Sequence, residues 1–343
     1  MTDLRRFMAE LAVNPALLAE FVHDPANGLK NAAIPAEEQA VLKTGQINDM
    51  WELLHGRRAG ETKATPAEVT APKPGQLAVV GTGIRSVGQL TVEAIAWMRE
   101  ADALLYLVTD PISEEIIHTL NPAAISLHGY YGEGAGRMGS YEAMVEHILS
   151  CVRRGQRTCA AFYGHPGVFA FPSHESIRRA RSEGHIAFML PAVSAEDCLF
   201  ADLGIDPSAN GLQTYEASDF LLHERIIDTS SQLILWQVGV VGDFTYRGEG
   251  YDLGGFPLLI QRLTEFYPYW HDVILYQAAL FLGYPPMIQQ LKLGQVTASY
   301  VNPSTTMYLP PARPTTPNAR MQHALRQLQG NDISQWPIRK ESP

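Results

Sequence analysis

The chain has 343 residues, of which 46% are hydrophobic and 18% are charged, proportions typical of a globular protein with a large buried core. Its formal net charge of −10 argues against a nucleic-acid-binding protein, and the sequence has no basic stripe. No apolar run is long enough to span a membrane, and the N-terminus lacks the hydrophobic region of a signal peptide.

The three cysteines, Cys151, Cys159 and Cys198, have no C-x-x-C spacing. This arrangement indicates neither a zinc site nor a disulfide framework, so we expect no bound metal. Reduced cysteines in a chain without a signal peptide predict a cytoplasmic protein.

Residues 1–56 predict a small all-helical module. Hydrophobic residues recur at about helical spacing between positions 7 and 21. Asn14 and Pro15 have the form of a helix N-cap followed by proline at the first helical position. Residues 35–45 have acidic side chains near their start and a glycine at their end, as a helix dipole favours. The pattern leaves two roles open: packing on the neighbouring domain, or recognition of another molecule.

Residues 57–75 contain three prolines and no apolar period, which predicts a solvated linker. From Gln76 onward, buried strands alternate with amphipathic helices. This alternation predicts a parallel sheet with right-handed crossovers, whose ligands bind beyond the carboxyl ends of the strands. We expect two α/β domains over residues 76–192 and 193–312, followed by a helix and a polar tail over residues 313–343.

Two glycine-rich turns follow strands at this expected ligand edge. The first, V-V-G-T-G-I-R-S-V-G, is a poor dinucleotide fingerprint because Gly88 follows Gly83 by five residues and not by three. It therefore indicates a tight turn that a ligand can approach, and it does not favour NAD. The second turn, Y-G-H-P-G, begins at Tyr163, where the predicted strand T-C-A-A-F-Y ends.

The stretch from Leu127 to Tyr141, L-H-G-Y-Y-G-E-G-A-G-R-M-G-S-Y, is the least core-like segment of the chain. Five glycines let its backbone turn sharply or pass close to a ligand. Its remaining polar groups include Tyr131 and Arg137. Tyrosine rings that pack with satisfied hydroxyl groups are the simpler alternative. The grouping of tyrosines with an arginine favours a site of chemistry.

Several blocks occur in a fixed order over residues 76–312: V-G-T-G-I, Y-Y-x-x-G-x-x-R-x-x-x-Y, F-Y-G-H-P-G-V-F, L-P-A-V-S-A-E-D-C-L-F-A-D, Y-E-A-S-D-F and Y-L-P-P. Together they resemble the tetrapyrrole-methylase-type S-adenosylmethionine methyltransferases, and most closely the borosin peptide backbone α-N-methyltransferases. The resemblance implies a two-domain α/β fold of the class III, tetrapyrrole-methylase-like type, here preceded by the helical module.

The resemblance also implies S-adenosyl-L-methionine as methyl donor, S-adenosyl-L-homocysteine as product, a precursor peptide as substrate and a homodimer. It assigns to the donor site the residues that stand in matching blocks: Gly81, Tyr163, His165, Val168, Phe169, Ser194, Ala195, Gln237 and Thr306.

For the catalytic loop, the resemblance points to the tyrosines and to Arg137. The lone pair of an amide nitrogen is delocalised, so its N–H must be removed or strongly polarised before methylation. A guanidinium lowers the pKa of a neighbouring tyrosine. We therefore assign Tyr131 as the base candidate, Arg137 as its electrostatic partner and Tyr141 as a hydrogen-bond donor to the imidate oxygen. The two tyrosine roles are exchangeable, and His128 stands where relatives often have another tyrosine.

Residues 1–56 resemble the small helical module that lies after the methyltransferase in fused borosin proteins, and the small subunit of an extradiol dioxygenase. Here the module comes first. Fused members end in an apolar core peptide, whereas this chain ends G-N-D-I-S-Q-W-P-I-R-K-E-S-P. We therefore expect an enzyme that acts in trans on a separate precursor. The alternatives are a corrin- or porphyrin-type small-molecule methyltransferase and a catalytically inactive peptide-binding homologue.

Overall fold

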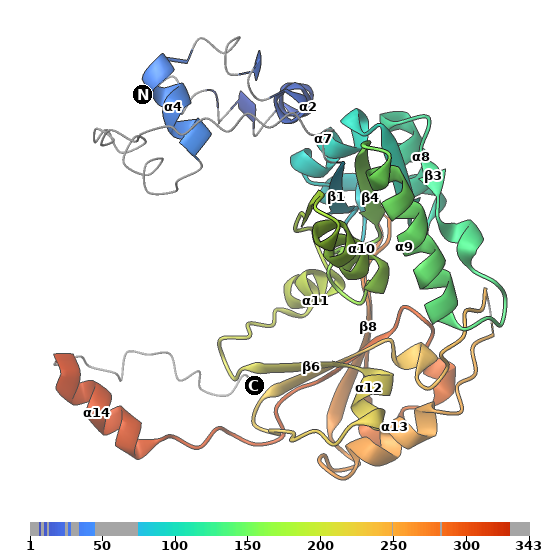
Figure 1. Cartoon of the computed structure of the whole chain (residues 1–343). Helices are drawn as coiled ribbons and strands as arrows, with labels where there is room; N and C mark the ends of the chain where they lie inside the picture. Colours follow the sequence, from blue (N-terminus) through green and yellow to red (C-terminus); the bar gives the residue numbers. More distant parts are fainter. Residues whose placement is uncertain are drawn as a thin grey trace. The chain divides into compact units, whose positions relative to one another are not determined.

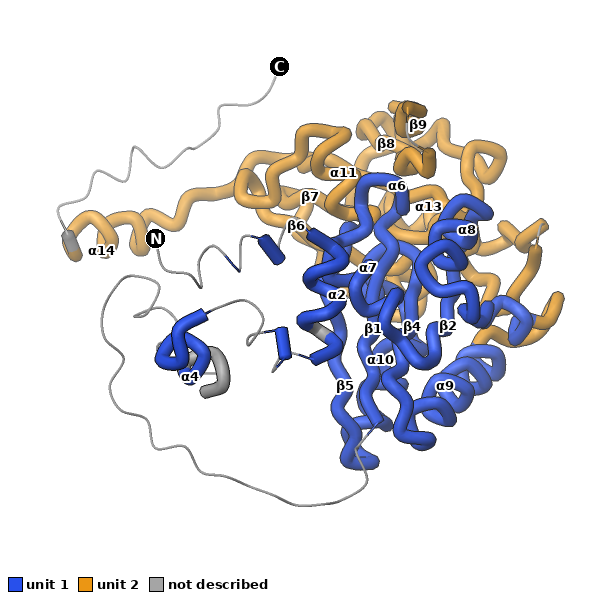
Figure 2. The backbone as a smooth tube through the Cα atoms, turned by 90° about the horizontal axis from the view of Figure 1, so that it is seen from above, with its two compact units in different colours: residues 1–131, 138–194 blue, residues 132–137, 195–343 orange. Residues whose placement is uncertain are grey.

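The computed structural model describes residues 7, 10–11, 14–24, 27–28, 34–44, 75–248, 250–281 and 283–329. The chain divides into two compact units (Figure 2). Unit 1 comprises residues 1–131 and 138–194, and unit 2 comprises residues 132–137 and 195–343. The predicted linker, except for Gly75, and the end of the predicted polar tail lie outside the described residues. Among the described helices, none has the length and apolar character needed to cross a membrane.

Unit 1 is built on a five-stranded sheet in the order β3-β2-β4-β1-β5. Figure 1 labels three of its strands, β1, β3 and β4. All the strand pairs are parallel, which confirms the parallel sheet predicted from the alternation of strands and helices. The strands are β1 Gln76–Gly81, β2 Ala103–Leu107, β3 Ile125–Ser126, β4 Arg157–Phe162 and β5 Ile186–Met189.

Helices cover both faces of this sheet because its central strands are apolar on both faces. Leu77 and Val79 of β1 pack in one core cluster with helices α9 and α10, whereas Ala78 and Val80 pack in a second cluster with α7 and α8. The helices are α6 Ser86–Gln89, α7 Val92–Glu100, α8 Pro111–Leu120, α9 Arg137–Arg153 and α10 Phe171–Ser182, with the 3₁₀ turn η1 His128–Tyr130 before α9.

Two helices of the N-terminal region are described, α2 Pro15–His23 and α4 Ala36–Thr44. Asn14 caps α2 by accepting from the Leu17 backbone N–H at 3.2 Å, as predicted. Helix α2 packs on α7, and His23 Nδ1 lies 3.7 Å from a Glu100 carboxylate oxygen of α7 and accepts a hydrogen bond from Arg157 of β4. These contacts fit the packing role, and they do not test the recognition role.

Unit 2 contains a mixed sheet in the order β6-β7-β10-β8-β9. Only β6 and β7 are parallel in it. One face packs on α12 and α13, and the other packs on α11. Its strands are β6 Leu212–Glu216, β7 Gln232–Trp236, β8 Asp272–Gln277, β9 Met287–Lys292 and β10 Thr306–Leu309. Its helices are α11 Ala195–Leu203, α12 Ala217–Leu222, α13 Phe256–Leu263 and α14 Ala319–Gln329, with 3₁₀ turns η2 Val238–Val240, η3 Leu293–Gln295 and η4 Ala298–Tyr300.

A buried carboxylate, Asp243, organises the loop after η2. Its Oδ1 accepts from the Thr245 backbone N–H at 2.9 Å and from the Thr245 hydroxyl at 2.6 Å. Its Oδ2 accepts from Arg247 Nε at 3.0 Å and from the Asp252 N–H at 3.1 Å. Burial acts to raise the pKa of Asp243, but these hydrogen bonds outweigh it and hold the pKa well below the ordinary 3.8.

We predict that Asp243→Ala lowers the free energy of unfolding by about 2–4 kcal/mol at pH 7, because several donors lose their acceptor. Since the folded-state pKa is depressed, the contribution of Asp243 is complete above its unfolded pKa and is lost as the pH falls below it. Denaturant titrations should therefore show a gap between wild type and variant that narrows below about pH 4. Asp272→Ala is the control, because Asp272 pairs with Lys292 on the surface and should cost less than about 1 kcal/mol.

Candidate active site

The loops after β1 and β4 approach each other at two glycines. Gly164 N–H donates to the Gly83 carbonyl at 2.9 Å, and Gly83 N–H donates to the Gly164 carbonyl at 3.3 Å. Both residues have positive φ, 73° for Gly83 and 67° for Gly164. A Cβ atom on Gly81 would lie 2.2 Å from the Gly164 oxygen and 2.5 Å from Ala192 Cβ. Gly81 is therefore required by backbone packing, whether or not a ligand also contacts it.

Two histidines fix the turn that follows Tyr163. The Gly167 N–H donates to His165 Nδ1 at 2.9 Å, and the Gly167 carbonyl lies 2.9 Å from His174 Nε2. The turn presents two apolar side chains, Val168 and Phe169, which are 39% and 50% exposed. Phe169 has φ 52°, a left-handed conformation that is strained for a non-glycine residue and is frequent at functional sites.

Aromatic rings from three elements of unit 1 gather around the predicted catalytic tyrosines. Tyr131 directly follows η1, and its ring lies edge-on to His128 at 5.6 Å and to Tyr141 at 6.3 Å. Tyr141, in the first turns of α9, stacks on Phe171 at 6.1 Å, where α10 begins. Both tyrosines are half-buried against the core cluster of α9 and α10. The structure thus brings Tyr131 and Tyr141 together.

Arg137 is held by residues of unit 2. Residues 134–137 pair with residues 244–246, with an antiparallel bridge between Gly136 and Thr245. Arg137 Nε donates to the Thr245 carbonyl at 2.9 Å, and its guanidinium lies 5.5 Å from the centre of the Tyr251 ring. Tyr251 and Thr245 belong to the loop that Asp243 organises. The predicted pairing of Arg137 with the two tyrosines stays a prediction.

The remaining residues predicted to contact the donor lie at the ends of elements. Ser194 is buried and ends unit 1, and Ala195 begins α11. In unit 2, Gln237 follows β7 with φ 59°, a second left-handed non-glycine residue. Thr306 is buried at the start of β10. The backbone N–H after Gln237 donates to the Thr305 carbonyl at 3.3 Å, so Gln237 and Thr306 flank one backbone contact.

Three residues with clear structural roles beside these groups were not identified from the sequence: Phe171, His174 and Asp243. The sequence Gly242-Asp243-Phe244-Thr245 contains the Asp-x-Thr spacing of a side-chain-capped turn and could have suggested Asp243. Nothing in the sequence connects His174 with Gly167 or Phe171 with Tyr141, because those contacts depend on how α10 packs. In the part of the chain that the structure describes, no three His, Cys, Asp or Glu side chains are grouped as metal ligands.

The sequence profile of the tetrapyrrole (corrin/porphyrin) methylases matches residues 76–279. Two solved structures share the fold. Uroporphyrin-III C-methyltransferase from Thermus thermophilus has a TM-score of 0.50 and 18% identity, over 69% of this chain and 93% of that one. A cobalt precorrin-4 methyltransferase has a TM-score of 0.51 and 14% identity, over 71% of this chain and 98% of that one.

Similarity is greater to proteins whose names combine a methyltransferase with a ribosomally synthesised cyclic peptide precursor. The dendrothelin A precursor of Dendrothele bispora is 46% identical over 246 residues, 71% of this chain and 59% of that protein. The omphalotin A precursor of Omphalotus olearius is 43% identical over the same shares of each chain. The match therefore spans about three fifths of the length of these relatives.

A type I borosin precursor protein of Coprinopsis marcescibilis is 41% identical over 263 residues, 75% of this chain and 67% of that protein. These matches confirm the family resemblance and the two-domain α/β fold expected from the sequence motifs. The chain belongs to the tetrapyrrole (corrin/porphyrin) methylases and, within them, to the borosin methyltransferases.

Proposed function

We propose that this protein transfers methyl groups from S-adenosyl-L-methionine to backbone amide nitrogens of a ribosomally made precursor peptide. The observation that supports it most is the pair of half-buried Tyr131 and Tyr141 rings, 6.3 Å apart, in a chain related to borosin methyltransferases. The names of the relatives join a methyltransferase to a peptide precursor, which favours a peptide over a tetrapyrrole as substrate.

The proposed donor residues suit a ligand that has a purine ring and charged groups. Val168 and Phe169 offer exposed apolar surface to a ring. Because His165 Nδ1 accepts from Gly167, the proton of a neutral His165 is on Nε2, which is left to donate to the ligand. The ligand supplies an activated methyl group on its sulfonium sulfur. We propose that the remaining predicted residues also bind the methyl donor: Gly81, Tyr163, Ser194, Ala195, Gln237 and Thr306.

The tyrosines and Arg137 would prepare the amide nitrogen. A tyrosine at its free pKa of about 10 is a weak base at neutral pH, so the phenolate must be favoured by a nearby positive charge. Either Tyr131 or Tyr141 then takes the amide proton, and the other hydroxyl donates to the developing imidate oxygen. Arg137 uses Nε to bind Thr245, which leaves its two terminal nitrogens for that oxygen.

The proposal is tested by incubating the purified protein with S-adenosyl-L-methionine and a candidate precursor peptide supplied as a separate chain. We expect successive mass gains of about one methyl group each, located on backbone nitrogens by fragmentation. Methylation of a corrin or porphyrin precursor and of no peptide would contradict the proposal. Methylation of only the enzyme's own chain would contradict the expected action in trans. Donor binding without transfer to any peptide would point to an inactive peptide-binding homologue.

We predict that Tyr131→Phe lowers kcat by roughly 10²–10⁴-fold while the Kd for S-adenosyl-L-homocysteine stays within about two-fold, because only proton transfer is lost. Tyr141→Phe should act in the same direction. The matched control is Tyr130→Phe, since the Tyr130 hydroxyl bonds His147 at 3.0 Å and lies outside the cluster. Single-turnover mass spectrometry and calorimetry give the two quantities. Equal losses in Tyr130→Phe and Tyr131→Phe would show that the tyrosine hydroxyls serve packing only.

A second prediction concerns the turn at Gly167. His165→Ala removes the Nε2–H group that we propose to donate to the ligand, a hydrogen bond worth about 1 kcal/mol, so the Kd for S-adenosyl-L-homocysteine should rise about five-fold. Calorimetry at fixed pH measures the change. His223→Ala, at an exposed site after α12, should leave the Kd unchanged. An unchanged Kd in His165→Ala would remove His165 from the donor site.

A further inference from the structure

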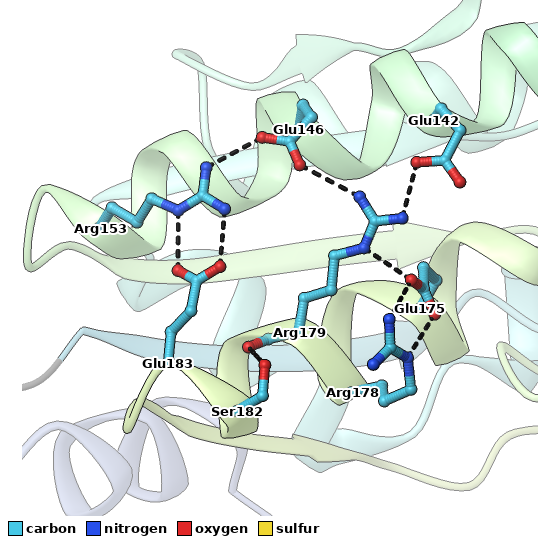
Figure 3. A network of polar contacts seen from close by, with 8 residues as sticks. All are labelled: Glu142, Glu146, Arg153, Glu175, Arg178, Arg179, Ser182 and Glu183. Atoms are coloured by element: carbon cyan, nitrogen blue, oxygen red, sulfur yellow. Dashed lines mark hydrogen bonds and ion pairs between the residues drawn. The ribbon is translucent and has the colours of Figure 1, made fainter.

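A network of seven charged side chains links helices α9 and α10 on the surface of unit 1 (Figure 3). Helix α9 contributes two glutamates and an arginine, and α10 with its C-cap contributes two arginines and two glutamates. The members are Glu142, Glu146, Arg153, Glu175, Arg178, Arg179 and Glu183.

Arg179 makes the connection nearest to the proposed site. Its Nη2 binds Glu142 at 2.7 Å and its Nη1 binds Glu146 at 3.1 Å, both on α9. Its Nε binds Glu175 at 2.6 Å, one turn earlier on α10. One planar guanidinium thus contacts carboxylates on two helices, which fixes their relative position more narrowly than a single point charge could.

The other two arginines, Arg153 and Arg178, bind different sets of carboxylates from Arg179 and can therefore serve as controls. Arg153, at the end of α9, binds Glu183 through two nitrogens at 2.6 and 2.7 Å and Glu146 through a third at 2.9 Å. It therefore links the two helices far from the tyrosines. Among the residues that the structure describes, Arg178 hydrogen-bonds Glu175 alone, at 2.5 and 2.7 Å, within α10 itself. Hydrogen bonds from Arg178 and Arg179 lower the pKa of Glu175 to about 2, so Glu175 stays charged at neutral pH.

Helix α10 also touches two parts of the proposed site. Its first residue, Phe171, stacks on Tyr141, and its residue His174 contacts the Gly167 carbonyl in the turn over residues 163–169 (the donor turn). Tyr141 directly precedes Glu142, the residue that Arg179 binds. Helix α10 is therefore the common support of the donor turn and of the helix that carries Tyr141.

We propose that Arg179 is a positioning residue for methyl transfer: by binding Glu142 and Glu146 it fixes Tyr141 against α10, the helix that also holds the donor turn through His174. This inference rests on the proposed function. Since small displacements of a reacting group lower rates strongly, loosening α9 should reduce turnover without removing any group that touches substrate or donor.

The test compares three variants in which an arginine becomes methionine, which keeps much of the side-chain bulk. Arg179→Met should lower kcat by roughly 10–100-fold, with KM and the Kd for S-adenosyl-L-homocysteine within about two-fold. Arg178→Met is the matched control, because it removes an arginine of α10 that does not reach α9, and kcat should change less than about two-fold. Arg153→Met should lower the melting temperature as much as Arg179→Met but kcat much less.

A double variant tests whether Arg179 acts through Glu142. If it does, the effects of Arg179→Met and Glu142→Gln on kcat should not add, and the double variant should be no slower than Arg179→Met alone. The proposal is overturned if Arg179→Met and Arg178→Met have equal kcat, or if kcat simply follows melting temperature across the three arginine variants.

A readout without turnover separates this inference from the proposed function. Tyrosines are replaced by 3-fluorotyrosine, and the ¹⁹F NMR signal of Tyr141 is assigned by its loss in Tyr141→Phe. The signal should shift or broaden in Arg179→Met and stay in place in Arg178→Met. If the wild type methylates no peptide but the signal moves as expected, the proposed function fails, whereas the inference that Arg179 fixes the position of Tyr141 stands. An unmoved signal in Arg179→Met overturns the positioning role.

Discussion

The close approach of the backbones that follow β1 and β4 is the constraint on which the edge of the unit 1 sheet depends. A side chain at Gly81 would overlap the Gly164 carbonyl, and the pair of hydrogen bonds between Gly83 and Gly164 requires positive φ at both residues. These contacts leave backbone and small groups at the strand ends, where parallel sheets bind their ligands. They also fix the start of the turn at His165, Gly167 and Phe169, so a packing requirement shapes the proposed donor surface.

Much of this edge could be predicted from the sequence because its causes are local. Apolar runs give β1, β2 and β4, and the glycines that follow them must turn or pass close to other backbone. The N-cap at Asn14 is local in the same way. Strand β9 was not predicted, because its half-exposed sequence M-I-Q-Q-L-K mixes polar residues into an edge strand. Its place in the sheet depends on pairing with β8, a tertiary constraint that overrides its weak pattern.

In the candidate site, too, the features with local causes could be predicted from the sequence and those that depend on tertiary contacts could not. The sequence predicted one loop carrying Tyr131, Arg137 and Tyr141, which is wrong in its extent, because α9 already begins at Arg137 and so Arg137 and Tyr141 are helical. The ring contact between the two tyrosines, 6.3 Å apart, is a tertiary contact that fits their predicted grouping. The support of Arg137 could not be predicted, because its hydrogen-bond partner, the Thr245 carbonyl, is 108 residues away in the sequence. That carbonyl is held in turn by the hydrogen bonds around Asp243. The position of Arg137 at the end of the glycine-rich loop therefore depends on the distant Asp243 carboxylate and not on residues of the loop itself.

The ion pairs between α9 and α10 illustrate why position and stability should be considered separately. Exposed salt bridges typically contribute little to stability, because solvent screens them and long side chains lose entropy when they are ordered. Arg179 is 25% exposed and Glu142 is 43% exposed, so hydrophobic packing of Met144, Val145 and Ile177 must provide most of the energy that joins the helices. Apolar contacts tolerate small sliding movements better than a planar guanidinium that binds three carboxylates at once. The ion pairs therefore restrict the relative position of α9 and α10. Helix α10 is also the helix that Tyr141 and the donor turn both contact.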